Sequence, residues 1–373
     1  MAQINFCTLG MFIIDEIEYE PPRPPMRDII GGAGTFAAVG ARIVAGQENS
    51  HRVGWVVDTG SDFPSHIRDQ ISSWNTHCLL RENVDRLTTR AWNGYGANEK
   101  RDFKYLTPKI QVDVTSLPET MVLSKTFHMV CSAERCYQIT KGVLERREEI
   151  GKRHGLELSR PIFVWEPIPS LCLPEHLSKF YEVIRYIDVV SPNDLELATY
   201  FGNSTWHVNE SRDQEIVQSI VTSGIGPEGT GTFVVRAGKD GCYAFSRGRK
   251  QLEIPAYYYA KVSDPTGAGN AFLGALCQAL ATPDCAPVST IHEVLNQSKL
   301  WETVCKNWND DGGIFSALIC ATIASSYVIE QVGVPILSFS PEGQELWNLT
   351  SYIERIRRYV QRLIHPQETA IEK

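Results

Sequence analysis

Short apolar runs alternate with longer amphipathic stretches along most of the chain. The short runs have the length and the β-branched composition of buried strands, and they cover residues 5–9, 52–57, 127–131, 162–165, 187–190 and 232–236. Between them, apolar residues recur with the period of a helix, as in residues 134–154, 174–185 and 214–223. This alternation predicts a three-layer α/β fold, in which a mostly parallel central sheet has helices on both faces.

Two segments depart from this alternation, residues 13–19 and residues 87–105. Both alternate polar and apolar positions, which is typical of antiparallel strands with one face in solvent. The second segment contains Asn93-Gly94-Tyr95-Gly96, which predicts a tight turn. We expect a small antiparallel β-flap, built from two excursions near residues 12–20 and 87–106, at the edge of the main sheet. The proline-rich residues 21–25 are expected to form a stiff connector back into the body.

The last third of the chain is less regular. Residues 282–311 show little periodicity and are expected to form an insertion before a long apolar helix at residues 314–332. Residues 341–365 predict one final amphipathic helix. We expect residues 1–373 to form a single large domain that carries the flap as a subdomain.

Composition narrows the class of protein. Hydrophobic residues are 43% and charged residues 21% of the chain, which excludes disordered, collagen-like and coiled-coil proteins. The net charge is −8 and no run of five basic residues occurs, so no nucleic-acid partner is expected. The N-terminus has no signal-like pattern and polar side chains interrupt the apolar window 314–334. We therefore expect a cytoplasmic protein with no membrane partner.

Cysteine and histidine spacing argues against a metal centre. The ten cysteines lie between Cys7 and Cys320 without a Cys-x-x-Cys pair, and the nine histidines contain no His-Glu-x-x-His. We expect reduced thiols in the core and no dedicated zinc site.

The segment with the most specific chemistry is Asp264-Pro265-Thr266-Gly267-Ala268-Gly269-Asn270, which runs into an apolar helix. Small residues at the start of a helix leave backbone N–H groups accessible at the positive end of the helix dipole. The segment therefore predicts an anion-binding site. The alternative is an ordinary strand-to-helix turn in which Asn270 is the N-cap residue.

Polar residues and glycines near other predicted strands favour the anion site. They are Asn193 and Glu196, Gly238 and Gly241, Gly31 and Gly32, and Asp15. Asn193 and Glu196 follow the strand at residues 187–190, and ligands of open α/β sheets bind at the carboxyl ends of strands. The alternative for this pair is a capping box of the next helix. Asp15 lies on the first flap strand, among apolar residues.

Taken in their order along the chain, these motifs give the sequence a resemblance to the ribokinase-like (PfkB) family of carbohydrate and nucleoside kinases, and the resemblance covers nearly the whole chain. The resemblance rests on the Gly10 to Asp15 element, Gly31-Gly32, residues 53–60, Asn193-x-x-Glu196, Gly238-x-x-Gly241 and the signature from Asp264 to Asn270. Together with Phe36, the terminal Asn270 looks most similar to a fungal branch related to the "maintenance of killer" proteins.

The resemblance implies a β-flap lid and transfer of a phosphoryl group from ATP, with Mg²⁺, to a hydroxyl of a sugar-like or nucleoside-like small molecule. It implies that the acceptor is held by Asp15, Gly31 and Gly32, beside Phe36. It implies that the nucleotide is bound by Asn193, Glu196, Gly238, Gly241, Asp264 and Thr266, with Glu196 at the metal. It also implies that the anion hole is formed by the backbone of Gly267, Ala268 and Gly269, beside Asn270. A homodimer formed through the lid is a further expectation.

Two residues depart from the family pattern. The last signature residue is an aspartate that takes the acceptor proton, and here it is Asn270. Loss of a general base typically slows a reaction about 10²–10⁴-fold, whereas an anion hole made of backbone survives the change. At Phe36 the family's sugar binders have an asparagine, so a polar contact to the acceptor is replaced by a ring.

Other nucleotide-binding motifs are excluded. The stretch Gly32-x-Gly34-x-x-Ala37 matches a dinucleotide fingerprint superficially, but it follows the proline-rich stretch and not a strand. A Walker-type phosphate loop is absent from the sequence. Two functions stay open, a slow small-molecule kinase and a kinase-fold protein that binds nucleotide or a protein partner without catalysis.

Overall fold

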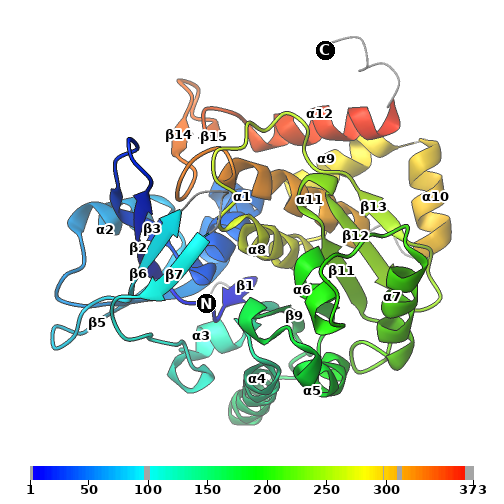
Figure 1. Cartoon of the computed structure of the whole chain (residues 1–373), viewed down its shortest axis with the longest axis horizontal. Coiled ribbons are helices and arrows are strands. Elements are labelled where there is room, and N and C mark those ends of the chain that lie inside the picture. The colour runs from blue at the N-terminus through cyan, green and yellow to red at the C-terminus, as the bar shows by residue number, and fades with distance from the viewer. Residues whose placement is uncertain (1–2, 96–100, 297, 309–312, 366–373) are drawn as a thin grey trace.

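The computed structural model describes residues 3–95, 101–296, 298–308 and 313–365. Its described residues form a nine-stranded central sheet with the order β13-β12-β11-β10-β9-β8-β1-β4-β5 (Figure 1). The strands are β1 Phe6–Thr8, β4 Val53–Thr59, β5 His77–Glu82, β8 Thr126–Cys131, β9 Ile162–Pro167, β10 Val189–Val190, β11 Thr232–Arg236, β12 Cys242–Ser246 and β13 Leu252–Ile254. Pairing is parallel from β5 to β11 and antiparallel on both sides of β12.

Helices cover both faces of this sheet, which confirms the predicted three-layer α/β fold. Alternate residues of β9 show the two faces. Val164 packs into one core with α1 and α8, whereas Phe163 and Trp165 pack into the other with α4 and α7. The helices are α1 Ala33–Asn49, α2 Ser65–Ser73, α3 Glu119–Val122, α4 Ala133–His154, α5 Leu177–Val183, α6 Asp194–Tyr200, α7 Ser211–Ser223, α8 Ala268–Ala281, α9 Ala286–Leu295, α10 Lys299–Trp308, α11 Gly313–Val328 and α12 Tyr352–Ile364.

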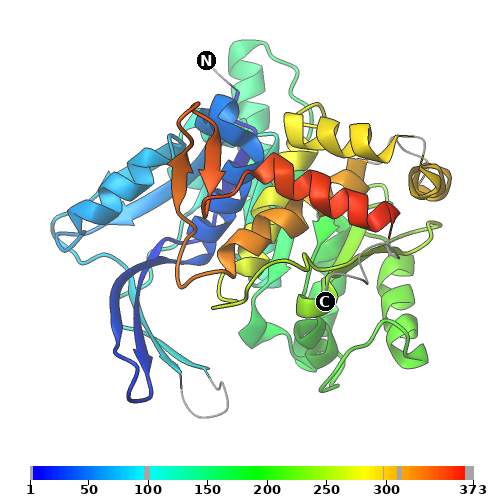
Figure 2. The same cartoon turned by 90° about the horizontal axis from the view of Figure 1, so that it is seen from above.

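A second sheet extends from one side of the body (Figure 2). It consists of β2 Ile13–Tyr19, β3 Met26–Gly31, β6 Arg90–Tyr95 and β7 Arg101–Tyr105 in the order β3-β2-β6-β7. The prediction that a flap is assembled from two excursions is therefore confirmed. The first excursion is longer than the predicted residues 12–20, because β3 returns along β2 and adds residues 26–31 to the flap.

Three details of the predicted flap are wrong. The strands β2 and β6 pair in parallel, so the flap is a mixed sheet. Residues 21–25 connect β2 to β3 within the flap and do not lead back to the body. The predicted turn is instead part of strand β6, which contains Asn93, Gly94 and Tyr95. Within this strand, the side chain of Asn93 donates to Asp15 on β2, and the Trp92 ring occupies the space beside Gly94. Gly96 lies outside the described residues.

The C-terminal third also differs from the prediction. The segment 282–311 contains α9 and α10, with residues 309–311 outside the described part of the chain. The predicted helix 174–185 is α5 flanked by two short 3-10 turns. The final helix starts at Tyr352, where Ser351 accepts a hydrogen bond from the N–H of Glu354, and a hairpin of β14 Leu337–Phe339 and β15 Glu345–Trp347 precedes it. Among the described helices, none is long and apolar enough to cross a membrane.

The backbones of α1 and α8 are in direct contact where the two helices cross. A Cβ atom added to Gly40 would lie 1.9 Å from the carbonyl oxygen of Ala271, and one added to Gly274 would lie 1.9 Å from that of Ala37. Both positions therefore require glycine. Because α1 follows the Gly31-Gly32 loop and α8 follows the Asp264–Gly267 loop, this contact sets the distance between two of the predicted site segments.

We predict that Gly274→Ala lowers the free energy of unfolding by about 1–3 kcal/mol, as overpacking of a close helix contact does. Gly142→Ala in α4 is the matched control, because its Cβ would meet only the Val114 side chain, at 3.6 Å or more. A helical Gly→Ala change at such an open position is worth up to about 1 kcal/mol in favour of the folded state. Chemical denaturation measures both variants, and equal stability of the two would contradict the close contact.

Candidate active site

Two cavities meet at the loop that precedes α8. The first, which we call the flap-side cleft, has a volume of about 760 Å³ and is lined by Tyr19, Arg23, Tyr95, Glu166, Asn193, Arg236, residues 262–267, Gly269 and Asn270. The second, the apolar cavity, has a volume of about 400 Å³ and lies between the Gly238–Gly241 turn, Tyr257, Phe272 and Ile329. Both cavities are lined by Arg236, Val262, Pro265 and Gly269. The two cavities therefore adjoin each other at the start of α8.

The loop itself is fixed by a buried carboxylate and a left-handed glycine. Asp264 is buried, and its Oδ1 accepts a hydrogen bond of 2.9 Å from the N–H of Thr266. Gly267 is the N-cap of α8 with φ of 84°, and the Phe36 ring packs so closely that a Cβ at Gly267 would lie 2.3 Å from it. A residue with a side chain fits neither constraint. The start of α8 is therefore open towards the cavities.

The alternative prediction of an ordinary turn with Asn270 as N-cap is wrong. The helix begins at Ala268, so Asn270 is its third residue, and no strand directly precedes the loop. Asn270 lines the flap-side cleft, and its buried Oδ1 has no hydrogen-bond partner among the residues that the structure describes. This oxygen is a free acceptor at the position where the family pattern has an aspartate.

Asn193 and Glu196 form the capping box of α6, which confirms the alternative interpretation of this pair, and Asn193 lies at the sheet edge beside Arg236 of β11. The Oδ1 of Asn193 accepts from the N–H of Glu196 at 2.7 Å, and Oε2 of Glu196 accepts from the N–H of Asn193 at 2.8 Å. Nδ2 of Asn193 donates to Oε1 of Glu196 at 2.8 Å. Both carboxylate oxygens of Glu196 are thus already hydrogen-bonded.

Sequence reasoning missed two buried charged residues, Glu166 and Arg236. Nη2 of Arg236 donates to Oε1 of Glu166 at 2.9 Å and lies 3.4 Å from Oε2 of Glu196. Burial raises the pKa of Glu196 to about 7; Arg236 opposes this rise and Glu166 adds to it. Burial likewise raises the pKa of Glu166, again against the effect of Arg236. A signal existed in the sequence, because Glu166 and Arg236 are charged residues at the carboxyl ends of apolar strands.

Aromatic residues of the flap reach the loop. The rings of Tyr19 and Tyr95 stack with centroids 5.4 Å apart, and the guanidinium of Arg23 lies 3.5 Å from the centre of the Tyr19 ring. The Tyr95 hydroxyl lies 3.1 Å from Oγ1 of Thr266, which links β6 to the loop before α8. These side chains come from segments that are far apart in sequence, so no local pattern predicts their meeting.

The predicted acceptor residues lie together but outside the flap-side cleft. Asp15 is 7% exposed, accepts a 3.0 Å hydrogen bond from Nδ2 of Asn93, and fills the space beside Gly31, where a Cβ would meet its Oδ2 at 1.9 Å. Phe36 is 3% exposed against Gly267. Asp15, Gly31, Gly32 and Phe36 do not appear among the described residues that line the cleft.

The predicted nucleotide turn lines the apolar cavity. Gly238 and Gly241 have φ of 51° and 89°, and a Cβ at Gly241 would collide with the carbonyl oxygen of Ile254 at 2.0 Å. The opposite wall includes Thr322 and Ser326 of α11 and the ring of Tyr257. This side of the cavity is apolar enough for a flat ring system and polar enough to orient it.

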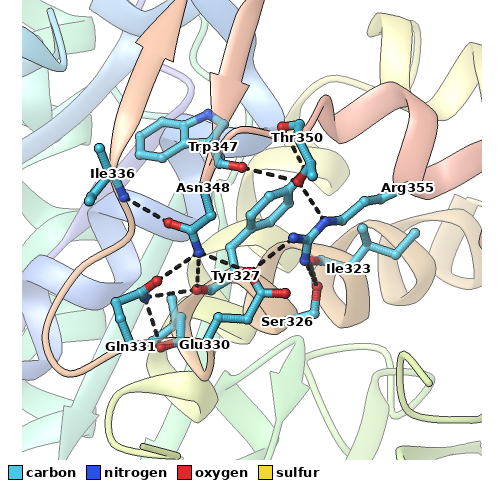
Figure 3. Close-up of polar contacts among 11 residues, drawn as sticks. Ile323, Ser326, Tyr327, Glu330, Gln331, Ile336, Trp347, Asn348, Thr350 and Arg355 are labelled. Atoms are coloured by element: carbon cyan, nitrogen blue, oxygen red, sulfur yellow. Dashed lines mark hydrogen bonds and ion pairs between the residues drawn. The ribbon is translucent and has the colours of Figure 1, made fainter. Parts of the chain in front are cut away.

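A polar network holds that wall in place (Figure 3). Arg355 of α12 donates to Oγ of Ser326 at 3.0 Å and to Oε2 of Glu330 at 2.9 Å, and its guanidinium lies 3.7 Å from the centre of the Tyr327 ring. Nδ2 of Asn348, which follows β15, donates to the same Glu330 oxygen at 2.9 Å. The C-terminal elements are therefore tied to the helix that lines the apolar cavity.

The residues at the junction fit a phosphate-bound Mg²⁺ better than a metal held by protein alone. Within the described residues, no group of three or more His, Cys, Asp or Glu side chains could hold a metal ion. Oε2 of Glu166 is, however, a buried oxygen without a hydrogen-bond partner at the cleft. Mg²⁺ usually takes one or two carboxylates and completes its shell with waters and substrate phosphates.

Comparisons with known proteins match this chain to one protein family. A model of the family described as "pfkB family carbohydrate kinase" matches residues 165–293, which include Asn193, Gly238 and the loop before α8. An uncharacterized protein of Schizosaccharomyces pombe is 33% identical, over 99% of this chain and 96% of its own length. The protein MAK32 of Saccharomyces cerevisiae is 31% identical, over 95% of this chain and 91% of its own length.

The chain belongs to the pfkB, or ribokinase-like, family. These two relatives are both yeast proteins, in keeping with the predicted fungal branch. The solved ribokinase of Giardia lamblia has the same fold, with a TM-score of 0.63 and 15% identity, over 98% of this chain and 99% of that one. The predicted ribokinase-like fold is thereby confirmed.

The buried His128 has a strongly lowered pKa, and the effect of this pKa on stability can be tested. This fully buried residue of β8 has Nδ1 3.0 Å from Oγ1 of Thr8, and its Nε2 has no hydrogen-bond partner in the described part of the chain. Burial lowers the pKa of His128 to about 3, and the charge of Arg236 adds to the effect. The folded protein thus keeps a neutral imidazole where the unfolded chain binds a proton below its ordinary value of 6.5.

We predict that His128 makes stability fall as the pH drops from about 6.5 towards 3, with full stability above that window. One proton gives a slope of at most about 1.4 kcal/mol per pH unit. His128→Gln should flatten the slope of the unfolding free energy, measured with urea at several pH values. The exposed His66→Gln variant is the control, and equal slopes in the natural protein and both variants would contradict the prediction.

Proposed function

We propose that the protein binds ATP with Mg²⁺ and transfers the terminal phosphoryl group slowly to a hydroxyl of a sugar-like or nucleoside-like molecule. The observation that carries this proposal is the meeting of the two cavities at the open start of α8. Phosphoryl transfer depends mainly on positioning and charge stabilisation, so a donor cavity, an acceptor cleft and an anion site between them are its main requirements.

The donor nucleotide fits the apolar cavity. Its base and ribose would lie between the Gly238–Gly241 turn and Tyr257, and its phosphates would extend to the N–H groups of Gly267 and Gly269, since the N–H of Ala268 donates to the carbonyl oxygen of Pro265 at 3.2 Å. Those N–H groups stabilise the charge on the transferring group. The buried Asp264 keeps the loop in shape through its bond to Thr266.

The metal would lie near the two carboxylates at the junction. Glu166 has a buried oxygen that could hold the metal, and Glu196, oriented by Asn193, would contact metal-bound water. Bound there, Mg²⁺ supplies positive charge that offsets the charge of the phosphates. The acceptor would lie beneath the flap, where the stacked Tyr19 and Tyr95 border the flap-side cleft and suit a flat or ring-shaped molecule. Asp15, the polar contact predicted from the sequence, is not among the described residues that line this cleft.

The second candidate is a kinase-fold protein that binds a nucleotide or a protein partner without catalysis. Two observations favour it. Asn270 has no basic group to take a proton from a hydroxyl, and Phe36 packs against Gly267 at 3% exposure beside the predicted acceptor residues. Neither observation removes the anion site, so nucleotide binding is compatible with both candidates, and phosphoryl transfer separates them.

Nucleotide binding is therefore the first test. Isothermal titration with ATP and Mg²⁺ should show binding, and Glu196→Gln should weaken its dependence on Mg²⁺ because a neutral amide orients metal-bound water poorly. The exposed Glu175→Gln variant is the control for loss of one carboxylate elsewhere. If millimolar ATP does not bind to the natural protein, both candidate functions that involve a nucleotide fail.

We predict that Asn270→Asp increases phosphoryl transfer by a large part of the about 10²–10⁴-fold that a general base usually provides. Asn270 lines the flap-side cleft, so an aspartate there would place a carboxylate where it can take the proton of an acceptor hydroxyl. The third position of a helix accepts a carboxylate well, so stability should change little. A screen of pentoses, hexoses and nucleosides with labelled ATP measures the rate.

The exposed Asn209→Asp variant controls for an added carboxylate away from the site. Equal rates for the natural protein and Asn270→Asp with a true acceptor would mean that another group takes the proton. If both forms bind ATP and neither phosphorylates any acceptor, the binding protein is the correct candidate.

A further inference from the structure

Arg236 is held rigidly on one side and has a free donor on the other. Its Nε donates to Oγ of Ser191 at 3.2 Å, and Nη2 donates to Oε1 of Glu166 at 2.9 Å and to the carbonyl oxygen of Ser191 at 3.0 Å. The residue is 9% exposed. Within the described part of the chain, no hydrogen bond is made by Nη1, which is the remaining nitrogen of the guanidinium.

Nη1 lies against the start of α8. A Cβ atom added to Gly269 would be 2.0 Å from Nη1 and 3.8 Å from Oε1 of Glu166. Gly269 is the second residue of the helix, where backbone N–H groups have no partner within the helix. A guanidinium donor and helical N–H donors therefore face the same space, and Arg236 lines both the flap-side cleft and the apolar cavity.

This arrangement places two positive groups, the guanidinium of Arg236 and the N-terminus of α8, beside each other. The N-terminus of a helix carries about half a positive charge, which repels a guanidinium placed beside it. Glu166 and Glu196 balance the charge on the Nη2 side. Asn270 of α8, which lines the same cleft as Arg236, is neutral, and the Oδ1 of Asp264 accepts the N–H of Thr266.

We propose that Arg236 is an anion-binding residue, and that its Nη1 and the first N–H groups of α8 together bind the terminal phosphates of a polyphosphate. The proposal rests on the proposed function in one respect, since it takes the polyphosphate to be that of the nucleotide. Glu166 and Glu196 are positioning residues here, because they hold the guanidinium edge-on so that Nη1 faces Gly269.

The same geometry explains the glycine at position 269. Any side chain there would occupy the place of Nη1 and displace the guanidinium from the helix start. Gly269→Ala therefore moves the charge away from the site while it keeps every charged residue of the protein. It tests the role of position and complements variants that change the arginine itself.

Inorganic tripolyphosphate is the probe, because it has no base, ribose or acceptor and its binding does not require catalysis. Isothermal titration at low salt should show at least about tenfold weaker binding for Arg236→Lys and for Gly269→Ala, since an ammonium cannot reproduce the directed Nη1 contact. Arg236→Gln leaves two buried carboxylates unpaired and can unfold the protein. The double variant Arg236→Gln with Glu166→Gln reduces that imbalance, and it should also lose affinity.

Arg247→Gln is the matched control, because this exposed arginine lies beyond the opposite end of the β11–β12 pair. It should bind tripolyphosphate within about twofold of the natural protein, since a distant exposed charge is screened by solvent and salt. Thermal unfolding of each variant verifies that it is folded before titration.

Three results would separate this proposal from the proposed function. Natural-like tripolyphosphate affinity in Arg236→Lys, Gly269→Ala and the double variant overturns the role of Arg236 and leaves the kinase proposal standing. The expected losses without phosphoryl transfer to any acceptor support the anion site and overturn the kinase. If the natural protein binds ATP with Mg²⁺ but not tripolyphosphate, the role of Arg236 is overturned as well.

Discussion

The direct contact between the backbones of α1 and α8 is the constraint on which the candidate site depends. Gly40 and Gly274 allow the two helices to approach until a carbonyl oxygen lies where a side chain would otherwise be. The Gly31-Gly32 loop leads into one helix and the Asp264–Gly267 loop into the other. Their close approach places Phe36 of α1 against Gly267 and fixes the start of α8 relative to the sheet.

Next to the start of α8, the buried charged side chains of Arg236, Glu166 and Glu196 contact one another. A single arginine at the end of β11 serves Glu166 at the end of β9 and Glu196 at the start of α6. Burying an ion costs several kcal/mol unless its partners are close, so these three residues constrain one another's positions. An asparagine in place of an aspartate at position 270 changes the shape of the site little, but it removes a negative charge and a group that could take a proton.

The fold was largely predictable because its signals are local. Each predicted strand of the central sheet exists, since a continuous apolar run such as residues 127–131 has only one stable place, inside a sheet covered on both faces. Edge strands such as β5 and β13 were not predicted, because polar residues dilute their patterns. The parallel pairing of β2 with β6 was not predictable either, since nothing in one strand specifies the direction of a partner seventy or more residues away.

The sequence by itself determined the loop before α8, the Asn193–Glu196 pair and the glycine turn after β11, because helix starts, caps and left-handed glycines are properties of a few consecutive residues. It also determined that the position of the expected base is Asn270. Tertiary structure alone decided that Arg236 faces Gly269, that Tyr19 stacks on Tyr95, and that Asp15 lies outside the cleft. These relations join segments tens of residues apart, and they depend on the packing of whole helices and strands, which no local pattern encodes.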